Sequence, residues 1–297
     1  MNDPVSRPLD AAAAALAVLL CLSWGFNQVA VKLALPEIPP LIQAAFRSTF
    51  AAFVVLVWAR LRGVKIMQSD GTLVPGIIAG VLFALEFLLI YRGLVWTTAS
   101  RAVLFLYMAP FFVVIGARWF LPGDTFDRRQ WLGLLLSFAG IVVAFGVPTP
   151  GGDPHELLGD AMLFLAAAAW GATTLVIKAT KLVRAPYEKT LLYQLIVSAP
   201  LLALAAEMLG ERVIAKPSAV ALGSLAYQTI WITVATYLAW FALIQRYSAN
   251  RLSAFTFLTP LFGVAAGHLV LGEPLTAGFA AAVLLVISGL VLVNRPR

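Results

Sequence analysis

The sequence predicts an all-α polytopic membrane protein in which ten transmembrane helices form two inverted five-helix repeats, with both termini cytoplasmic. Three observations predict this fold class: the composition, ten recurring apolar segments, and a second half that repeats the first. The 297-residue chain is 61% hydrophobic and 12% charged, with a mean hydropathy of +0.92. A soluble domain is about 25% charged. So few charges cannot cover a water-exposed surface, so we expect the surface to face lipid.

Ten apolar segments are long enough to cross a bilayer as helices, which takes roughly 20 residues. They are continuous, whereas strands of a membrane barrel alternate apolar and polar residues over about 10 positions. A helix also satisfies its own backbone groups inside lipid. Little chain remains between the segments, so we expect no separate soluble catalytic domain. The segments are 10–34, 39–59, 73–95, 100–121, 129–147, 158–180, 187–208, 217–245, 250–271 and 276–294.

The charges between the segments predict the orientation of the chain. Of the 21 lysines and arginines, fifteen lie at the termini or around the loops that follow even-numbered segments, five lie on the opposite side, and Arg47 lies inside a segment. Positively charged loops stay in the cytoplasm, so we expect both termini there. The net charge of +7 therefore reflects membrane topology, and no nucleic-acid partner is expected.

The second half of the chain repeats the first at an offset of about 146 to 150 residues. Each half, 1–150 and 151–297, holds five segments, and because five is odd the second half enters the membrane from the opposite side. Inverted repeats are typical of transporters that work by alternating access. Some channels also have them, so a channel remains an alternative. The matching positions include Trp24 with Trp170, Lys32 with Lys178, Arg101 with Arg251, and Pro110 with Pro260.

Short motifs in a fixed order give the chain a family resemblance. A Trp-Gly pair lies near the start of each half, a proline lies in the fourth and ninth segments, and "LGEPLT" and "ISGLVLV" lie before and within the last segment. In these features the chain resembles the drug/metabolite transporter superfamily, and within it the EamA-type members. It looks most like bacterial exporters of aromatic and other neutral amino acids. The first half departs from the pattern, because "LPGDTF" replaces the Gly-Glu form.

The resemblance implies a secondary transporter of the bacterial inner membrane that exports neutral or aromatic amino acids, or similar small metabolites, through a central cavity. Efflux of lipophilic organic cations remains an alternative. The expected partners are a small-molecule substrate and the bilayer, and the oligomeric state stays open. Cofactors and metals are not expected, because Cys21 is the only cysteine and "HELLGD" lacks the second histidine of a zinc motif. The sequence contains no nucleophile–base pattern and no phosphate-binding loop, so we do not expect an enzyme.

Polar and aromatic residues inside the segments are the candidate cavity residues. An aromatic face can receive an apolar side chain or a ligand ammonium, and polar side chains in a bilayer usually face the bundle interior. Packing between helices, or exposure to lipid, remains the alternative for each of them. The candidates are Trp24, Asn27, Glu86, Tyr91, Tyr107, Trp170, Thr174, Tyr227, Trp231 and Tyr237.

Two charged residues, Arg47 and Glu86, lie inside the second and third segments at similar depths. Charges inside a membrane are costly and usually have a partner, so we expect these two to lie close enough to interact. Neither is duplicated, because the matching positions hold Tyr193 and Thr236. The favoured interpretation is an ion pair that joins the two helices, and the alternative is that Glu86 couples transport to protons.

Prolines, lysines and glycines at particular positions predict local features. A proline removes a backbone hydrogen bond and kinks a helix, so we expect Pro110 and Pro260 to act as gating elements. Lys178, like Lys32, lies near the end of its segment, where a long side chain brings its ammonium to the interface. Gly76 and Gly80 form a G-x-x-x-G pair, which predicts close helix packing.

Overall fold

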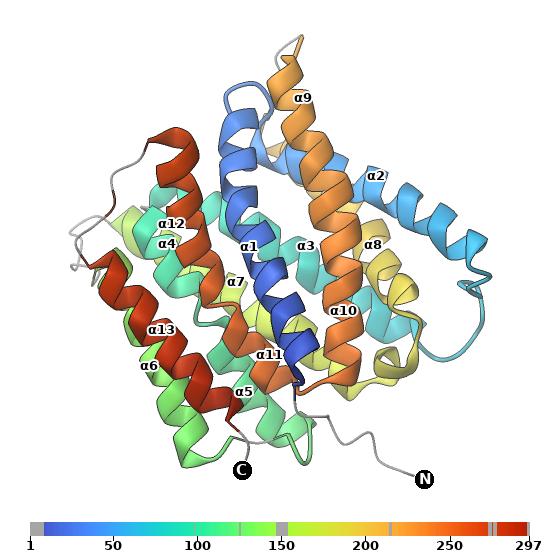
Figure 1. The fold of residues 1–297 in the computed structure, drawn as a ribbon. Helices are drawn as coiled ribbons and strands as arrows, with labels where there is room; N and C mark the ends of the chain where they lie inside the picture. Colours follow the sequence, from blue (N-terminus) through green and yellow to red (C-terminus); the bar gives the residue numbers. More distant parts are fainter. Residues whose placement is uncertain are drawn as a thin grey trace.

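The structure, a computed structural model, is a bundle of helices (Figure 1). It describes residues 9–97, 99–124, 126–146, 154–213, 216–272, 275 and 278–295. The elements are α1 (Ala11–Ala34), α2 (Pro40–Leu61), α3 (Leu73–Trp96), α4 (Ala99–Leu106), α5 (Ala109–Phe120), α6 (Arg128–Phe145), α7 (Pro154–Ala179), η1 (Lys181–Arg184), α8 (Tyr187–Met208), α9 (Ala219–Ala226), η2 (Tyr227–Thr236), α10 (Tyr237–Arg246), α11 (Ala249–Phe255), α12 (Leu258–Leu271) and α13 (Phe279–Asn294).

Nine helical stretches among the described residues are long and apolar enough to cross a membrane. Three of them combine consecutive elements: α4 with α5, α9 with η2 and α10, and α11 with α12. The last helix, α13, is apolar but has 16 residues, fewer than the roughly 20 of a full span. All ten predicted segments therefore coincide with helices, while the count of ten crossings stays a prediction.

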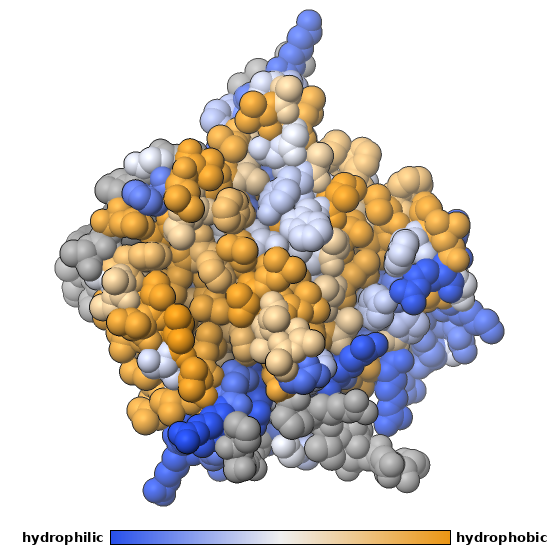
Figure 2. Space-filling view, viewed as in Figure 1, coloured by the Kyte–Doolittle hydropathy of each residue, from blue (hydrophilic) through white to orange (hydrophobic). Residues whose placement is uncertain are grey.

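The outer surface of the bundle is apolar across its middle. Figure 2 shows hydrophobic residues over most of the viewed face, with hydrophilic residues gathered mainly along its lower edge. Large apolar side chains point outward, such as Phe53 and Leu284, which are 66% and 67% exposed. In Figure 1, α1 begins and α13 ends at that same lower end. This arrangement agrees with a lipid-facing bundle, and the cytoplasmic location of the lower end stays a prediction.

Both predicted proline kinks are present, and each one separates two helices. α5 begins just before Pro110, and α12 begins just before Pro260. A proline ring clashes with the carbonyl group four residues earlier, which belongs to Leu106 for Pro110 and to Thr256 for Pro260. α4 ends at Leu106, and Thr256 caps the C-terminus of α11. The breaks therefore lie where the proline ring excludes the preceding α-helical turn.

The eighth span contains a π-helix, η2, for which the sequence offered no signal. It continues α9 and leads into α10 without an intervening loop. Thr233 Oγ1 donates a hydrogen bond to the carbonyl oxygen of Gln228, five residues earlier, at 2.9 Å. Turns of a π-helix close between residues i and i+5 and are frequent at functional sites. Because each turn takes more residues than in an α-helix, side chains on either side of η2 do not follow one 3.6-residue period.

The helices pack in pairs that correspond between the two halves of the chain. α2 packs against its own counterpart α8, and α6 packs against its counterpart α13. α3 packs against α7, and the corresponding contact in the other direction is that of α9 and η2 with α1. Likewise α5 contacts α7 and α12 contacts α1. The predicted close approach at Gly76 and Gly80 is confirmed: a Cβ atom on Gly80 would lie 2.5 Å from the Cβ of Val197, and one on Gly76 would lie 2.3 Å from the ring of Tyr193.

Two lysines bind partners that the sequence did not predict. Lys189, counted above as a cytoplasmic loop charge, is 1% exposed in α8, and its Nζ donates to Asp70 Oδ2 at 2.8 Å. This hydrogen bond is the largest of the causes, ahead of hydrogen bonds from Thr72, that lower the pKa of the Asp70 carboxyl to about 2. Lys178 Nζ donates to the carbonyl groups of Ile244 and Tyr247 at 2.8 and 2.6 Å, at the end of α10. A cation there complements the partial negative charge of a helix C-terminus.

Candidate functional site

A cavity of about 240 Å³ lies among α1, α2, α3, α7, α8 and α10. Its wall is mostly aromatic and aliphatic, with a small number of polar side chains, which is typical of ligand sites. Pockets for drug-sized ligands measure roughly 300 to 1,000 Å³, so this cavity suits a smaller molecule. The polar lining residues are Asn27, Gln28, Arg47, Glu86, Thr173, Thr174, Gln194 and Thr259.

Eight of the ten residues that the sequence nominated line this one cavity. They come from five spans, the first, third, fourth, sixth and eighth along the chain, and the bundle brings them together. Their part in binding stays a prediction. The eight are Trp24, Asn27, Glu86, Tyr91, Tyr107, Trp170, Thr174 and Tyr237.

Trp24 of α1 organises one wall of the cavity. Its Nε1 donates to Thr236 Oγ1 at 2.9 Å, which fixes the plane of the indole. The indole lies edge-on to Trp240 and Tyr237, with ring centroids 5.1 and 6.3 Å apart. Tyr237 in turn lies edge-on to Phe83 of α3 at 6.0 Å. Edge-to-face pairs at these distances are favourable, so α1, α3 and α10 hold a preformed aromatic surface.

Tyr107 and Trp170 form a second aromatic pair across the cavity wall. Their rings meet edge-on, with centroids 5.9 Å apart. Tyr107 lies at the break between α4 and α5, so the disruption caused by Pro110 helps to position it. Trp170 is the repeat counterpart of Trp24. The duplicated tryptophans therefore both line the same cavity.

Tyr227 and Trp231 do not line the cavity, contrary to our expectation from the sequence. Both contact Ser23 of α1: the Tyr227 hydroxyl donates to its carbonyl oxygen at 3.3 Å, and Trp231 Nε1 donates to its Oγ at 3.1 Å. Trp231 is also 43% exposed. The two residues lie in η2, the π-helical segment that precedes Tyr237.

Arg47 and Glu86 line the same cavity. The guanidinium of Arg47 lies over the ring of Phe87, with its Cζ 4.5 Å from the centroid. Both charges face one cavity, as their similar depths led us to expect, and a direct ion pair between α2 and α3 stays a prediction. α2 is held mainly by α8, where Ser198 Oγ donates to Ser48 Oγ at 3.1 Å.

Gln194 of α8 is a cavity residue that the sequence reasoning missed. It is fully buried, and its Oε1 has no hydrogen-bond partner among the described residues. The available signal was a glutamine in the middle of an apolar span, where a polar side chain is costly unless it faces the bundle interior.

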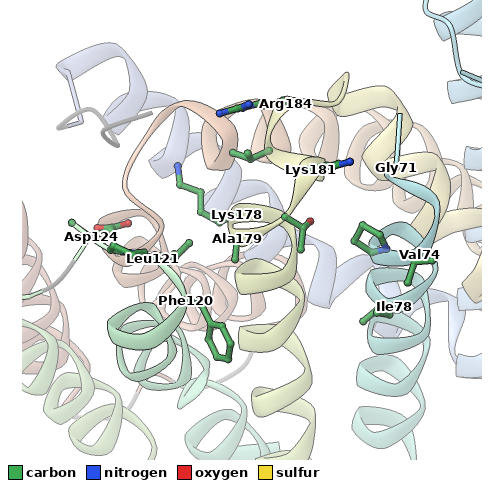
Figure 3. Close-up of a pocket in the computed structure, with 15 residues that line it drawn as sticks. Gly71, Val74, Ile78, Phe120, Leu121, Asp124, Lys178, Ala179, Lys181 and Arg184 are labelled. Atoms are coloured by element: carbon green, nitrogen blue, oxygen red, sulfur yellow. The ribbon is translucent and has the colours of Figure 1, made fainter. Parts of the chain in front are cut away.

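A second, more open pocket of about 990 Å³ lies at the end of α7. Figure 3 shows this end between the last residues of α5, near Phe120 and Leu121, and the start of α3, near Val74 and Ile78. Its rim carries three basic side chains and one acid, Asp124, which accepts hydrogen bonds from Ser248 Oγ at 2.5 Å and Ala249 N at 2.9 Å. Asp124 therefore caps α11 and is engaged in structure. The basic residues are Lys178, Lys181 and Arg184.

Comparison with known proteins gives the family. A family model described as the EamA-like transporter family matches residues 11–146 and 157–295. The chain belongs to the EamA-like transporter family. This confirms the resemblance drawn from the short motifs, and it makes the protein a multi-pass membrane transporter.

This EamA-like transporter matches several relatives over nearly their full length, and their names describe transporters or efflux pumps. A "Probable amino-acid metabolite efflux pump" of Salmonella typhimurium is 28% identical over 290 residues, covering 93% of this chain and 92% of that protein. A protein of the same name in Escherichia coli is 25% identical over 93% of this chain and 92% of its own length. The uncharacterized transporter YvbV of Bacillus subtilis is 25% identical, covering 95% of this chain and 91% of its own.

A solved structure shares the fold of this EamA-like transporter. It superposes with a TM-score of 0.82 at 19% sequence identity, covering 96% of each chain, and is described only as a crystal structure of a protein. At this identity the likeness concerns the fold alone.

Proposed function

We propose that this transporter exports neutral or aromatic amino acids, or similar small metabolites, by alternating access between two inverted halves, 1–150 and 151–297. The observation that carries the proposal is the central cavity, of metabolite size, in which aromatic rings from both halves surround a few buried polar groups. Two relatives are named for amino-acid metabolite efflux. The bacterial inner membrane, with cytoplasmic termini, is the proposed location.

The packing of the helices supports the alternating-access part of this proposal. Corresponding pairs, α3 with α7 and η2 with α1, or α5 with α7 and α12 with α1, are what two halves related by an approximate twofold axis produce. Such halves can pack in two nearly equivalent ways, which opens a central site first to one side and then to the other. Pro110 and Pro260 lie at the breaks of equivalent spans, where gating motions would be accommodated.

The composition of the cavity favours small neutral metabolites over lipophilic organic cations. A cation site needs an acid without a competing positive charge nearby, whereas here Glu86 shares the cavity with Arg47. The volume of about 240 Å³ also lies below the range of drug-sized pockets. A channel would need a continuous polar path, whereas the wall of this cavity is mostly aromatic and aliphatic.

Counterflow in proteoliposomes tests the proposal. Vesicles holding purified protein are loaded with one unlabelled amino acid at a time, and uptake of trace labelled amino acid is followed with no pH gradient. A carrier gives transient accumulation of label that depends on the side chain of the loaded amino acid. Lack of accumulation with every amino acid, in vesicles shown to hold folded protein, would refute amino-acid export. Rapid flux without exchange would instead indicate a channel.

A further inference from the structure

Arg47 is a buried arginine with hydrogen-bond donors that the described residues leave unsatisfied. It is 2% exposed, and its Nε and Nη2 atoms make no hydrogen bond among the described residues. The contact with Phe87 satisfies only the face of the guanidinium. Arginine stays charged in proteins, and a charge in the membrane interior is stabilised by a partner of opposite sign. The in-plane donors of Arg47 therefore remain available to a group in the cavity that Arg47 lines.

The geometry of those donors indicates which group they suit. The guanidinium presents parallel N–H groups in a rigid fork, which matches the two oxygens of a carboxylate. Phe87 holds the plane of the fork from one side, and burial in α2 restricts its rotation. The site is thus preorganised for a planar anion, and a lysine at this position would offer charge without the fork.

Acceptors of hydrogen bonds line the same cavity. Glu86 lines the cavity, and Asn27 Oδ1 and Gln194 Oε1 are buried there without a hydrogen-bond partner among the described residues. An ammonium group offers three N–H donors and one positive charge. One cationic fork and one carboxylate in a single cavity therefore match a ligand that carries both charges and is neutral overall.

We propose that Arg47 binds the α-carboxylate of the transported amino acid and that Glu86, with Asn27 and Gln194, receives its α-ammonium. This rests on the proposed amino-acid export and narrows its substrate class to zwitterions. The aromatic wall around Trp24 and Tyr237 then receives the side chain. The two charged residues, which have no counterparts in the second half, act as substrate receptors instead of as a structural pair.

Three indole compounds distinguish the contribution of Arg47 to binding from that of Glu86. Tryptophan carries both charges, tryptamine lacks the carboxylate, and indole-3-propionate lacks the ammonium. Each is titrated as an inhibitor of labelled-tryptophan counterflow and as a stabiliser against heat in detergent. Unfolding is followed by reaction of a thiol dye with Cys21, the only cysteine, which is fully buried. This readout is independent of indole fluorescence.

Substitution of either charged residue is expected to remove the preference of the protein for tryptophan over one of the two analogues. Arg47→Gln should weaken tryptophan binding on the order of tenfold to hundredfold, the usual worth of a hydrogen bond to a charged group, and should leave tryptamine binding nearly unchanged. Arg47→Lys should restore part of the loss. Glu86→Gln should remove the preference for tryptophan over indole-3-propionate. The matched control is Arg62→Gln, because Arg62 lies outside the cavity at the end of α2 and bonds the Tyr187 hydroxyl.

Retention of the wild-type ratio of tryptophan to tryptamine affinity by folded Arg47→Gln would overturn the inference. If that variant does not fold, the test uses Arg47→Lys. A wild-type ratio of tryptophan to tryptamine affinity in Arg47→Lys would exclude recognition of the carboxylate by the guanidinium. If the wild-type protein exchanges no amino acid, the proposed function fails separately. The Arg47 site is then tested with indole-3-propionate alone, which should raise the unfolding temperature of the wild-type protein and not of Arg47→Gln. No stabilisation would refute the site as well.

Discussion

Replacing Asp70 by asparagine should destabilise the protein at neutral pH, because it leaves the buried ammonium of Lys189 without its carboxylate partner. The pKa of the Asp70 carboxyl falls from 3.8 to about 2 in the folded protein. At roughly 1.36 kcal/mol per pKa unit, this shift corresponds to at most about 2.5 kcal/mol. The carboxylate is 30% exposed, and solvent screening reduces the effect to about 1 to 2 kcal/mol.

The pH dependence of this effect has a defined sign. A carboxyl whose pKa is lowered by folding stabilises the protein fully above its unfolded pKa of 3.8, and the contribution disappears as the pH falls towards the folded value of about 2. The difference between the wild-type protein and Asp70→Asn should therefore be constant from pH 7 to 5 and should narrow below pH 4.

Thermal unfolding in detergent, followed by tryptophan fluorescence, measures the difference. A loss of about 1 to 2 kcal/mol corresponds to a fall of about 2 to 8 °C in the unfolding temperature for a chain of this size. Glu207→Gln is the matched control, because its partner Arg212 and Glu207 itself are 65% and 70% exposed, and such surface pairs contribute little. An unchanged unfolding temperature for Asp70→Asn at pH 7, or a difference that persists undiminished at pH 3, would refute the reasoning.

Three further predictions concern packing, gating and topology. Gly80→Leu should lower the unfolding temperature by several degrees, because its Cβ alone meets α8 at 2.5 Å, whereas Gly223→Leu, with open space around it, should not; equal effects would contradict the packing argument. Pro110→Ala and Pro260→Ala should slow counterflow several-fold while ligand-induced stabilisation persists; unchanged rates would exclude gating at the breaks. A C-terminal fluorescent protein fusion should fluoresce and a C-terminal alkaline phosphatase fusion should be inactive; the reverse pattern would contradict cytoplasmic termini.

The sequence predicted those features that depend on local chemistry. Continuous apolar runs located the helices, because the cost of unpaired backbone groups in lipid leaves few alternatives to a helix. Pro110 and Pro260 located the breaks for an equally local reason, the missing N–H and the ring clash. The aromatic candidates Trp24 and Trp170 were found through their repetition, since equivalent positions in two halves meet at a shared central cavity.

The features that the sequence could not predict depend on partners distant in the chain. Lys189 follows a loop rich in basic residues, and only the folded bundle brings Asp70 to it. Arg47 and Glu86 line one cavity, but their similar depths alone could not show which other side chains, such as Phe87 and Gln194, would surround them. Tyr227 and Trp231 were nominated because they are aromatic and lie inside an apolar segment, and this reasoning does not show which side of the helix faces the cavity; both contact Ser23 instead.

The π-helix has a consequence for the proposed alternating-access mechanism. In a carrier made of two inverted halves, each half adopts the shape of the other when the access side changes. α3 is a continuous α-helix of 24 residues, whereas its counterpart contains the ten-residue π segment Tyr227–Thr236. The halves cannot exchange shapes completely without converting hydrogen-bonded turns of one size into the other. Under the proposed alternating-access mechanism, we therefore expect the two access states of the empty carrier to differ in free energy, so that one of them predominates until substrate binds.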